Sequence, residues 1–415
     1  MKKQTFLNQW LWKWHIIAGL ITLPFMLILA ITGTIYLFKP MYEASIYEDI
    51  YKVKPDGEPL SYEAQFAAAQ AASSAPVNSV TLPRGADDAT MFQSGMWAGA
   101  SMVYVNPYTG DVTGTLRNEG TFMSGVREMH GELFLSKPGT YVVELVASWF
   151  LVLILTGLYV WWPARGWSLR GFFTIRLKQG KRIFFRDLHS VTAFWLSTFL
   201  LIILAGGLPW TDVFGKQFQR LQNATGTGFP QYWVQSNGLQ SINTREDGLS
   251  IDDMVQVARQ QNLKGDITVR FPANENGVFS VANKSLYLHD QSVRHFDLYS
   301  GSKILDYAWK DVGPMMAGRL FFMRLHEGQY GLWNWIILLC VALSLIVSII
   351  AALTSYIMRK QKGSWSIPKP PEHFKVGWVA GGAIVILGAI LPLFGASLIL
   401  LFCITMMGKM RASKA

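Results

Sequence analysis

WHIIAGLITLPFMLILAITGTIYLF, residues 14–38, contains 23 consecutive residues, 16–38, without a charged side chain. A helix of roughly 20 apolar residues crosses a hydrocarbon core of about 30 Å. Three further runs of this kind lie at residues 141–162, 189–210 and 332–358. A fifth apolar region, 376–408, is interrupted at Pro392. The sequence predicts a helical membrane bundle with four core helices and a C-terminal hairpin.

The composition agrees with a membrane protein. Hydrophobic residues make up 51% of the chain and charged residues only 15%, which is too apolar for an ordinary soluble protein. Lys2 and Lys3 precede the first run as in a signal peptide, but that run is too long for one, so we expect an uncleaved helix. Cys340 and Cys403 lie inside apolar stretches, which argues against a disulfide framework or a cysteine metal site. The absence of a CxxCH sequence excludes covalent c-type haem.

The distribution of charge predicts the orientation. Short connecting segments before residue 16, at 163–188, at 359–375 and after 408 hold 18 basic residues and two acidic ones, so we place them in the cytoplasm. The long connections, 39–140 and 211–331, hold 19 basic and 24 acidic residues and are placed in the periplasm. The net charge of +10 therefore sets topology, and we expect the lipid bilayer, not nucleic acid, as the partner. The basic tail returns to the cytoplasm only if 376–408 forms two helices, which gives six spans.

Each long connection has the pattern of an α+β module. In the first, residues 61–72 predict a helix, 79–83 and 101–106 predict strands, and 107–111 predict a turn. The second repeats this order with a helix at 250–261, strands at 266–271, 278–287 and 293–298, and a turn at 298–302. The sequence thus divides into 1–38 (cytoplasmic N-terminus and first span), 39–140 (first periplasmic module), 141–210 (second span, basic loop, third span), 211–331 (second periplasmic module), 332–358 (fourth span), 359–375 (cytoplasmic loop) and 376–415 (hairpin and tail).

An internal duplication places four of the seven histidines at equivalent positions. His15 and His189 begin the two outward spans at the cytoplasmic side, whereas His130 and His326 precede the two return spans at the outer side. Imidazoles in a membrane are costly unless they have a partner, and a metal ion is one. Depth pairs His15 with His189 and His130 with His326. Two neutral imidazoles fill both axial positions of a haem iron, which favours electron transfer over oxygen binding.

Neighbouring residues fit this interpretation. Gly19 and Ala193 lie one turn after the inner histidines and leave room for a flat macrocycle, and Gly131 and Gly328 follow the outer ones. Arg127 and Arg324 are expected to bind haem propionates. Two alternatives stay open: the histidines anchor helix ends together with the tryptophan belts, or each pair binds zinc, although two ligands fall short of the usual four.

Three other features carry weaker hypotheses. Glu144 lies inside the second span and could relay a proton or bind a quinol, or it could simply reach water. His289 and His295 are expected on neighbouring strands of the second module, more consistent with half-exposed strand residues than with ligand contacts. His373 follows Lys-Pro-Pro-Glu in a cytoplasmic loop, and we expect no catalytic role for it.

Several motifs together resemble the PepSY-associated transmembrane-helix family, which includes inner-membrane ferric-siderophore reductases and other iron-regulated membrane proteins. They are Trp14-His15 with Gly19, Arg127-Glu-Met-His130-Gly, Arg186-Asp-Leu-His189, Arg324-Leu-His326 and the turns Tyr108-Thr-Gly110 and Tyr299-Ser-Gly301. The resemblance covers essentially the whole chain. It implies two haem b groups, PepSY-like modules in the periplasm, and a ferric chelate as the substrate.

The leading hypothesis is therefore a membrane-bound haem oxidoreductase of the bacterial inner membrane, acting in iron acquisition by reducing a ferric siderophore or another ferric chelate. The cytoplasmic loops are too short for a dinucleotide-binding unit, so electrons are expected from membrane quinol or a separate reductase. No catalytic residue is identified. The alternative is a non-enzymatic membrane protein whose PepSY-like modules bind a partner and whose histidines are structural. A transporter would need a polar path, and apart from Glu144 the spans offer almost no charge.

Overall fold

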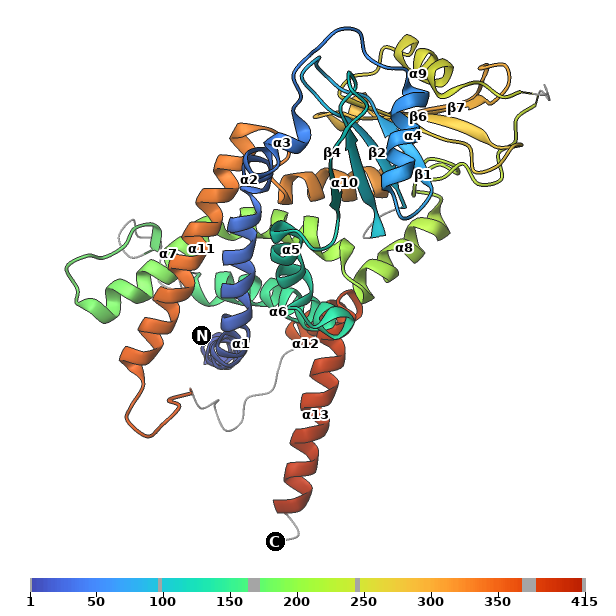
Figure 1. The fold of residues 1–415 in the computed structure, drawn as a ribbon. Helices are drawn as coiled ribbons and strands as arrows, with labels where there is room; N and C mark the ends of the chain where they lie inside the picture. Colours follow the sequence, from blue (N-terminus) through green and yellow to red (C-terminus); the bar gives the residue numbers. More distant parts are fainter. Residues whose placement is uncertain (1, 96–98, 163–171, 243–246, 368–377, 413–415) are drawn as a thin grey trace. The chain divides into compact units, whose positions relative to one another are not determined.

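The computed structural model describes residues 2–95, 99–162, 172–242, 247–367 and 378–412 (Figure 1). The chain forms two compact units. The helical unit comprises Met1–Leu37, Val126–Leu221 and Phe322–Ala415, and the sheet unit comprises Phe38–Gly125 and Gln222–Phe321. Each is described by itself.

Four long helices build the helical unit. They are α1 (Lys2–Tyr36), α6 (Ser136–Trp161), α7 (Lys181–Gly207), which continues into the 3₁₀ turn Leu208–Trp210, and α11 (Leu332–Arg359). All four are long and apolar enough to cross a membrane, as the sequence predicted, and the chain is a multi-pass membrane protein. Helix α1 packs on α6 and α11, and α7 packs on α11 and α6. Large apolar side chains such as Ile21, Trp195 and Ile350 remain exposed on the outside of the bundle, where lipid would cover them.

The C-terminal region breaks where the sequence predicted. Helix α12 (Trp378–Ile390) ends just before Pro392, and α13 (Pro392–Ala412) begins there. The bend is sharp, since a Cβ atom on Gly395 would lie 2.4 Å from the carbonyl oxygen of Gly388. Leu391 and Phe394 at this bend are buried against Leu208. Both helices are shorter than or comparable with one span, so six crossings remain a prediction.

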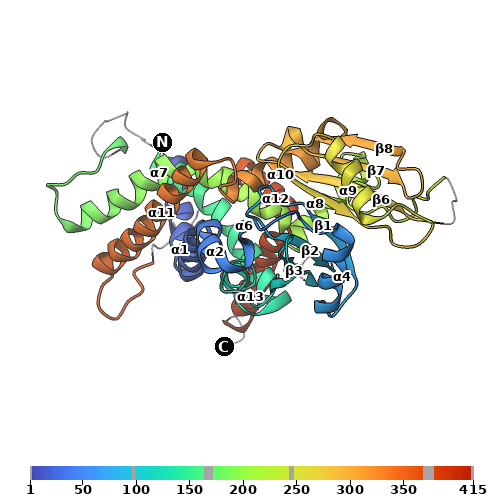
Figure 2. The ribbon, with the colours of Figure 1, turned by 45° about the horizontal axis from the view of Figure 1, so that its top comes forward.

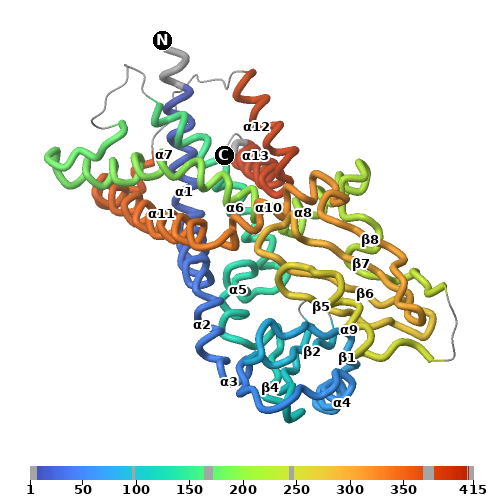
Figure 3. Tube along the Cα trace, turned by 90° about the horizontal axis from the view of Figure 1, so that it is seen from above, coloured from blue at the N-terminus to red at the C-terminus, as the bar shows by residue number. Residues whose placement is uncertain are grey.

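The sheet unit contains one antiparallel sheet of eight strands in the order β4-β3-β2-β1-β5-β6-β7-β8, of which the run from β5 to β8 can be followed in Figure 3. The first half has helix α4 (Tyr62–Ala72) and then β1 (Val77–Thr81), β2 (Thr90–Ser94), β3 (Ser101–Val105) and β4 (Val112–Arg117). The second half has helix α9 (Ile251–Gln260) and then β5 (Asp266–Arg270), β6 (Val278–Lys284), β7 (Ser292–Asp297) and β8 (Lys303–Ala308). The same order of elements thus occurs twice, and β1 pairs with β5.

Helices α4 and α9 cover the same face of the sheet (Figures 1 and 2). Between them and the strands lies the largest hydrophobic core of the unit, with Phe92, Val103, Val269 and Phe279 fully buried. The second half is also covered on its other face, where Trp233 packs with Val293 and Val312.

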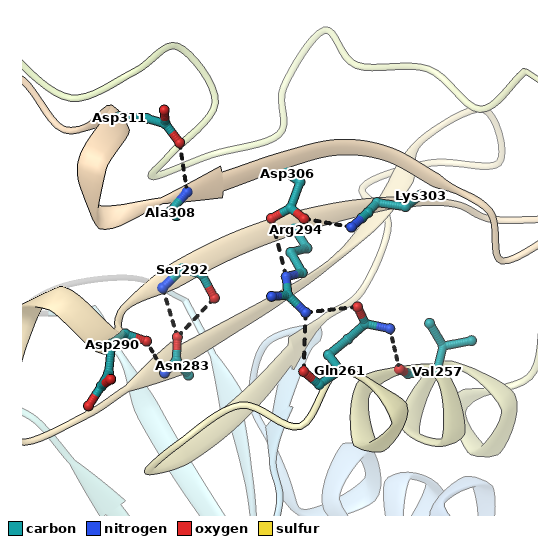
Figure 4. Close-up of polar contacts among 10 residues, drawn as sticks. All are labelled: Val257, Gln261, Asn283, Asp290, Ser292, Arg294, Lys303, Asp306, Ala308 and Asp311. Carbon is teal, nitrogen blue, oxygen red and sulfur yellow. Dashed lines mark hydrogen bonds and ion pairs between the residues drawn. The ribbon is translucent and has the colours of Figure 1, made fainter.

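Polar side chains fasten α9 and the last strands of the second half (Figure 4). Arg294 on β7 donates to the backbone and side-chain oxygens of Gln261, directly after α9, and pairs with Asp306 on β8. Asn283 on β6 donates to the carbonyl of Asp290 and accepts from Ser292. These contacts fix the register of the strands that the short hairpin loops join.

Short helices connect the two units along the chain. They are α2 (Lys39–Ile46), α3 (Glu48–Tyr51), α5 (Phe122–Glu132), α8 (Val213–Thr225) and α10 (Pro314–His326). The predicted boundaries placed His130 and His326 with the outer modules. The structure groups both with the long helices, because each ring is hydrogen-bonded to a residue of α1 or α7.

Candidate cofactor-binding site

A cavity of about 470 Å³ lies among α1, α6, α7 and α11. His15 and His189 both line it, as do Gly19 and Ala193, which the sequence placed one turn further along the same helix faces. Most of the remaining wall is aliphatic or aromatic. Cofactor sites in proteins fall in the range of about 300–1,000 Å³, with apolar walls and a few polar groups. The first predicted histidine pair therefore meets at a cavity of suitable size and character.

The second predicted pair is in direct proximity. The ring centroids of His130 and His326 are 6.2 Å apart, with an angle of 70° between the ring planes. Two nitrogen–metal bonds of about 2 Å each, the length typical of imidazole ligands, together with the two ring radii fill a separation of this size. His130 belongs to α5 and His326 ends α10. The separation of the two rings is thus compatible with one metal ion held between them.

The two pairs lie at different depths of the bundle. Helix α1 carries His15 directly before its uncharged stretch and contacts His130 through Thr32, close to the C-terminal end of the helix. A helix rises about 1.5 Å per residue, so the 17 residues between positions 15 and 32 span about 25 Å. This is close to the thickness of a hydrocarbon core, about 30 Å. One pair therefore lies toward each face of the membrane-spanning region.

All four histidines use the same ring nitrogen for a hydrogen bond to a neighbouring helix. The Nδ1 atoms of His15 and His130 lie 3.0 Å from the hydroxyl oxygens of Thr156 and Thr32, respectively. In His189, Nδ1 lies 3.0 Å from the Ser348 hydroxyl, and in His326 it lies 2.8 Å from the carbonyl of Ile203. The bonding pattern leaves Nε2 of each ring as the nitrogen available to a ligand.

The protons on these bonds can be assigned. A threonine hydroxyl has one proton, and Thr32 donates it to the carbonyl of Ile28 while Thr156 donates its own to Val152. Each hydroxyl must therefore accept from the histidine, so that His130 and His15 are protonated on Nδ1 when neutral. The unprotonated nitrogen is then Nε2, which is the form that binds a metal.

The other two histidines have the same tautomer for a simpler reason. The carbonyl of Ile203 can only accept, so His326 must donate from Nδ1. His189 lies 3.2 Å from the carbonyl of Ser348 in addition to its hydroxyl, so it also donates. A histidine that merely anchored a helix end would not need this uniform choice of nitrogen.

Glycines make room for the rings. A Cβ atom on Gly157 would lie 3.1 Å from Cε1 of His15, and one on Gly33 or Gly207 would lie 3.3 Å from Cε1 of His130 or His326. Gly33 and Gly207 both lie eighteen residues after the inner histidine of their half. Gly328 has a different role from the one predicted. Its positive φ of 73° lets the chain turn directly after α10.

No larger group of metal-binding side chains occurs among the residues that the structure describes. Within the described part of the chain, no group of three or more His, Cys, Asp and Glu side chains is placed to hold a metal ion.

Comparison with known families identifies the family of this chain. A family model described as the PepSY-associated TM region matches residues 12–359. The chain belongs to this family. The matched segment contains all four paired histidines and every strand of the sheet. A search of curated proteins found no match to this member of the PepSY-associated family.

The two predicted propionate ligands of this PepSY-associated protein differ from each other. Arg324 is buried on α10, two residues before His326, whereas Arg127 is exposed on α5, three residues before His130. On a helix, side chains two and three residues before a histidine point in directions about 100° apart. Of these two arginines, only Arg324 is buried.

Three other arginines, which were not predicted as ligands, line the inner cavity: Arg182 and Arg186 on α7 and Arg359 at the end of α11. The sequence spacing could have identified Arg182 and Arg186, because they precede His189 by seven and three residues and so share its helix face. Asp187 positions this segment. It is fully buried and pairs at 2.7 Å with both Arg176 and Arg186.

Glu144 has a structural role. Its side chain is fully buried, so the idea that it reaches water is wrong. Both carboxylate oxygens accept hydrogen bonds of 2.8 Å from the backbone N–H groups of Val213 and Phe214. These are the first residues of α8, where unpaired N–H groups and the helix dipole favour a negative charge.

The remaining histidines lie away from both pairs. His295 is fully buried, not half-exposed as expected, because β7 is covered on both faces. Its Nδ1 lies 2.8 Å from the Ser280 hydroxyl, and its Nε2 accepts no ligand because it lies 3.0 Å from the Tyr232 carbonyl. Burial lowers the pKa of His295. His289 is exposed in a 3₁₀ turn (Leu288–Asp290), not on a strand. His373 lies outside the described residues.

Proposed function

We propose that this protein transfers electrons across the bacterial inner membrane through two b-type haems, each bound by two histidines, to a ferric siderophore or another ferric chelate in the periplasm. The observation that carries the proposal is the uniform tautomer of four histidines that meet in two pairs. His15 and His189 would hold the inner haem, and His130 and His326 the outer one. When bound, haem would supply one-electron chemistry at these two sites.

The protein's own residues would provide the conditions for this chemistry. Each histidine donates from Nδ1 to a fixed acceptor, which orients its ring and increases the basicity of Nε2. The mostly aliphatic and aromatic walls of the inner cavity would keep water away from the ligands. With two imidazoles as its protein ligands, each haem would favour electron transfer over oxygen binding.

The wider organisation belongs to the same proposal. We infer that the two halves of the sheet unit arose by duplication, that they lie in the periplasm, and that electrons enter at the cytoplasmic side from membrane quinol or a separate reductase. Reduction releases iron from a chelate, because hard oxygen ligands hold ferric iron more tightly than ferrous iron. The excess of basic residues in the short connections supports this orientation.

Haem counting tests the proposal directly. Wild-type protein purified from cells supplied with haem should contain two haems by the pyridine haemochromogen assay. His15→Ala and His326→Ala should each reduce the count to about one, since losing an axial ligand exposes the site. His289→Ala is the matched control, because its ring is exposed and lies outside both pairs, and it should retain two.

The reaction can be followed with the same protein. Chemically reduced wild type should be reoxidised by a ferric siderophore, with ferrous iron trapped by a coloured chelator, and the His326→Ala variant should be slower. A colourless wild type, or two haems with unchanged spectra in both alanine variants, would show that the histidines have another role.

A further inference from the structure

The inner cavity has a cationic end. Arg182 and Arg186 lie in the first two turns of α7, and Arg359 is the last residue of α11. Since Arg182 and Arg186 share the helix face of His189, the three arginines lie at the same end of the cavity as the histidine pair. The residues of this end are contributed by two different helices that pack on each other.

The charge at this end is not balanced by the cavity wall. Among the described residues that line it, three are arginines and none is Asp or Glu. Asp187 compensates only part of this charge, because it is already shared between Arg176 and Arg186. Arg182 lies close enough to Arg359 for the two charges to interact. Like charges beside an apolar cavity repel strongly, so this end favours an anionic group.

Arg359 is held in place and does not simply extend into water. Its guanidinium carbon lies 4.8 Å from the ring centre of Trp12, which also lines the cavity, and 5.9 Å from that of Tyr356. The sequence neighbours Lys181 and Lys360 do not line the cavity. Membrane topology requires only that the cytoplasmic ends of the helices carry positive charge, which lysine and arginine supply equally well. The presence of arginines, and not of the neighbouring lysines, on the cavity wall therefore indicates a binding role.

We propose that Arg182, Arg186 and Arg359 bind the two propionate carboxylates of the inner haem, so that its acidic edge faces the cytoplasmic end of the bundle. The inference rests on the proposed function. Guanidinium groups bind carboxylates through paired hydrogen bonds, which a lysine cannot make. Three positive charges beside the macrocycle would also stabilise the reduced iron and raise the potential of this haem relative to a site without them.

Two matched double variants test the assignment. Arg182→Gln with Arg359→Gln and Lys181→Gln with Lys360→Gln remove the same formal charge from adjacent positions. Each purified protein is mixed with excess apomyoglobin, and the loss of haem is followed spectroscopically. A reductive titration then resolves the two haems. We expect the arginine variant to lose one of its two haems faster, by about tenfold for each charge-assisted hydrogen bond removed, and one reduction wave to move to a more negative potential.

The outcomes separate the two proposals. A wild type without haem contradicts the proposed function and this inference together. A wild type with two haems whose arginine and lysine variants release haem at the same rate contradicts only the arginine assignment. Lipid phosphate is the other source of an anion at this depth, so the measurement is repeated in nanodiscs of zwitterionic and of anionic lipid. If both variants release haem at the same rate, and their reduction potentials differ only in nanodiscs of anionic lipid, the arginines would be assigned to lipid.

Discussion

Thr32 and Thr156 lie on different helices, yet each has the same two hydrogen bonds. Each hydroxyl donates to a carbonyl four residues earlier in its own helix and accepts from a histidine of another element. A glycine follows each threonine and faces the same imidazole. In each Thr-Gly pair the threonine thus orients the imidazole ring and the glycine leaves room for it. Replacing the threonine alone would change the orientation of the histidine while keeping the histidine itself.

Thr156→Val keeps the shape of the side chain but removes the acceptor for His15 Nδ1. Losing the hydrogen-bond acceptor of a metal-bound histidine lowers metal affinity about 10- to 100-fold, so the inner haem should be released faster by a factor in this range. Its midpoint potential should rise, because a less basic imidazole stabilises the ferric state less. Thr354→Val removes an equivalent bond to a carbonyl, that of Ile350, without touching a histidine. If both variants retain haem equally, the Thr156 hydroxyl does not support the ligand.

Glu144 permits a prediction that separates stability from proton transfer. Glu144→Ala should destabilise the protein by about 1.5–3 kcal/mol per lost bond to the charged group, because two N–H groups of α8 lose their acceptor. Glu144→Gln should cost less, since its amide oxygen can still accept. The apparent melting temperature of the purified protein measures this order. A proton relay would instead leave stability largely intact and change the pH dependence of haem reduction in the Gln variant.

At this scale the sequence identified the histidines but not all of their surroundings. The histidines repeat in register, and depth is readable from hydropathy, so the pairing could be predicted. The role of Glu144 could not, because its partners are backbone N–H groups seventy residues away. Arg359 was likewise hidden, since only packing brings the end of α11 beside Trp12.

Helices α4 and α9 cap each other. Asp252, at the start of α9, accepts from the backbone N–H groups of Tyr62 and Glu63 at the start of α4. Glu63 in turn accepts from the backbone N–H of Ile251, the first residue of α9. Ser61 and Ser250 provide the ordinary caps within each helix. The two helix N-termini therefore stabilise each other across the two halves of the sheet unit.

A double-mutant cycle tests this exchange. Glu63→Ala and Asp252→Ala should each destabilise the sheet unit by about 0.5–2 kcal/mol, the usual cost of losing a helix cap. The double variant should cost less than the sum of the two, because the caps belong to one contact. Thermal unfolding of the full protein is followed by intrinsic fluorescence, with the exposed Glu58→Ala as the control. Strict additivity of the two changes would mean that the helices are capped independently.

The elements that the sequence predicted are those with a strong apolar pattern. Helices α4 and α9 and strands β1, β3, β5, β6 and β7 were found to within a few residues. Strands β4 and β8 were missed because they are the two edges of the sheet, with one face open and few buried residues. Strand β2 was missed because its two large apolar residues, Met91 and Phe92, are adjacent and the other three residues are polar, so that the strand has no alternating pattern.

The pairing of β1 with β5 turns two four-stranded halves into one sheet. Val80 lies opposite Val269, and Thr81 lies opposite Thr268, with their hydroxyl oxygens 2.8 Å apart. These residues are almost two hundred positions apart, and nothing local in the sequence predicts their contact. Each half alone would expose an unpaired strand edge, a liability that the pairing removes. We therefore expect the two halves to fold as one unit.

The position of the C-terminal bend indicates on which side of the membrane the tail lies. Leu391 and Phe394 pack with Leu208, at the end of α7 that lies toward the outer histidine pair. Trp149 of α6 contacts Phe394 and donates to the Ser397 hydroxyl. Helix α12 thus reaches the outer end of the bundle at the bend, and α13 leaves from it. The tail should return to the side on which α12 begins, which the basic residues after position 408 also favour.

Cysteine labelling tests this topology. With Cys340 and Cys403 replaced by alanine, a cysteine at Glu119 in the sheet unit should react with a membrane-impermeant maleimide in cells with a permeabilised outer membrane. Cysteines at Lys178, between α6 and α7, and at Ala412, at the end of α13, should react only after the inner membrane is lysed. Labelling at Ala412 before lysis, with Lys178 still protected, would mean that 376–408 crosses once. Because α12 has only 13 residues and spans about 20 Å, protection at Ala412 would also require the membrane to be thin at α12 or the bend to lie below the outer surface.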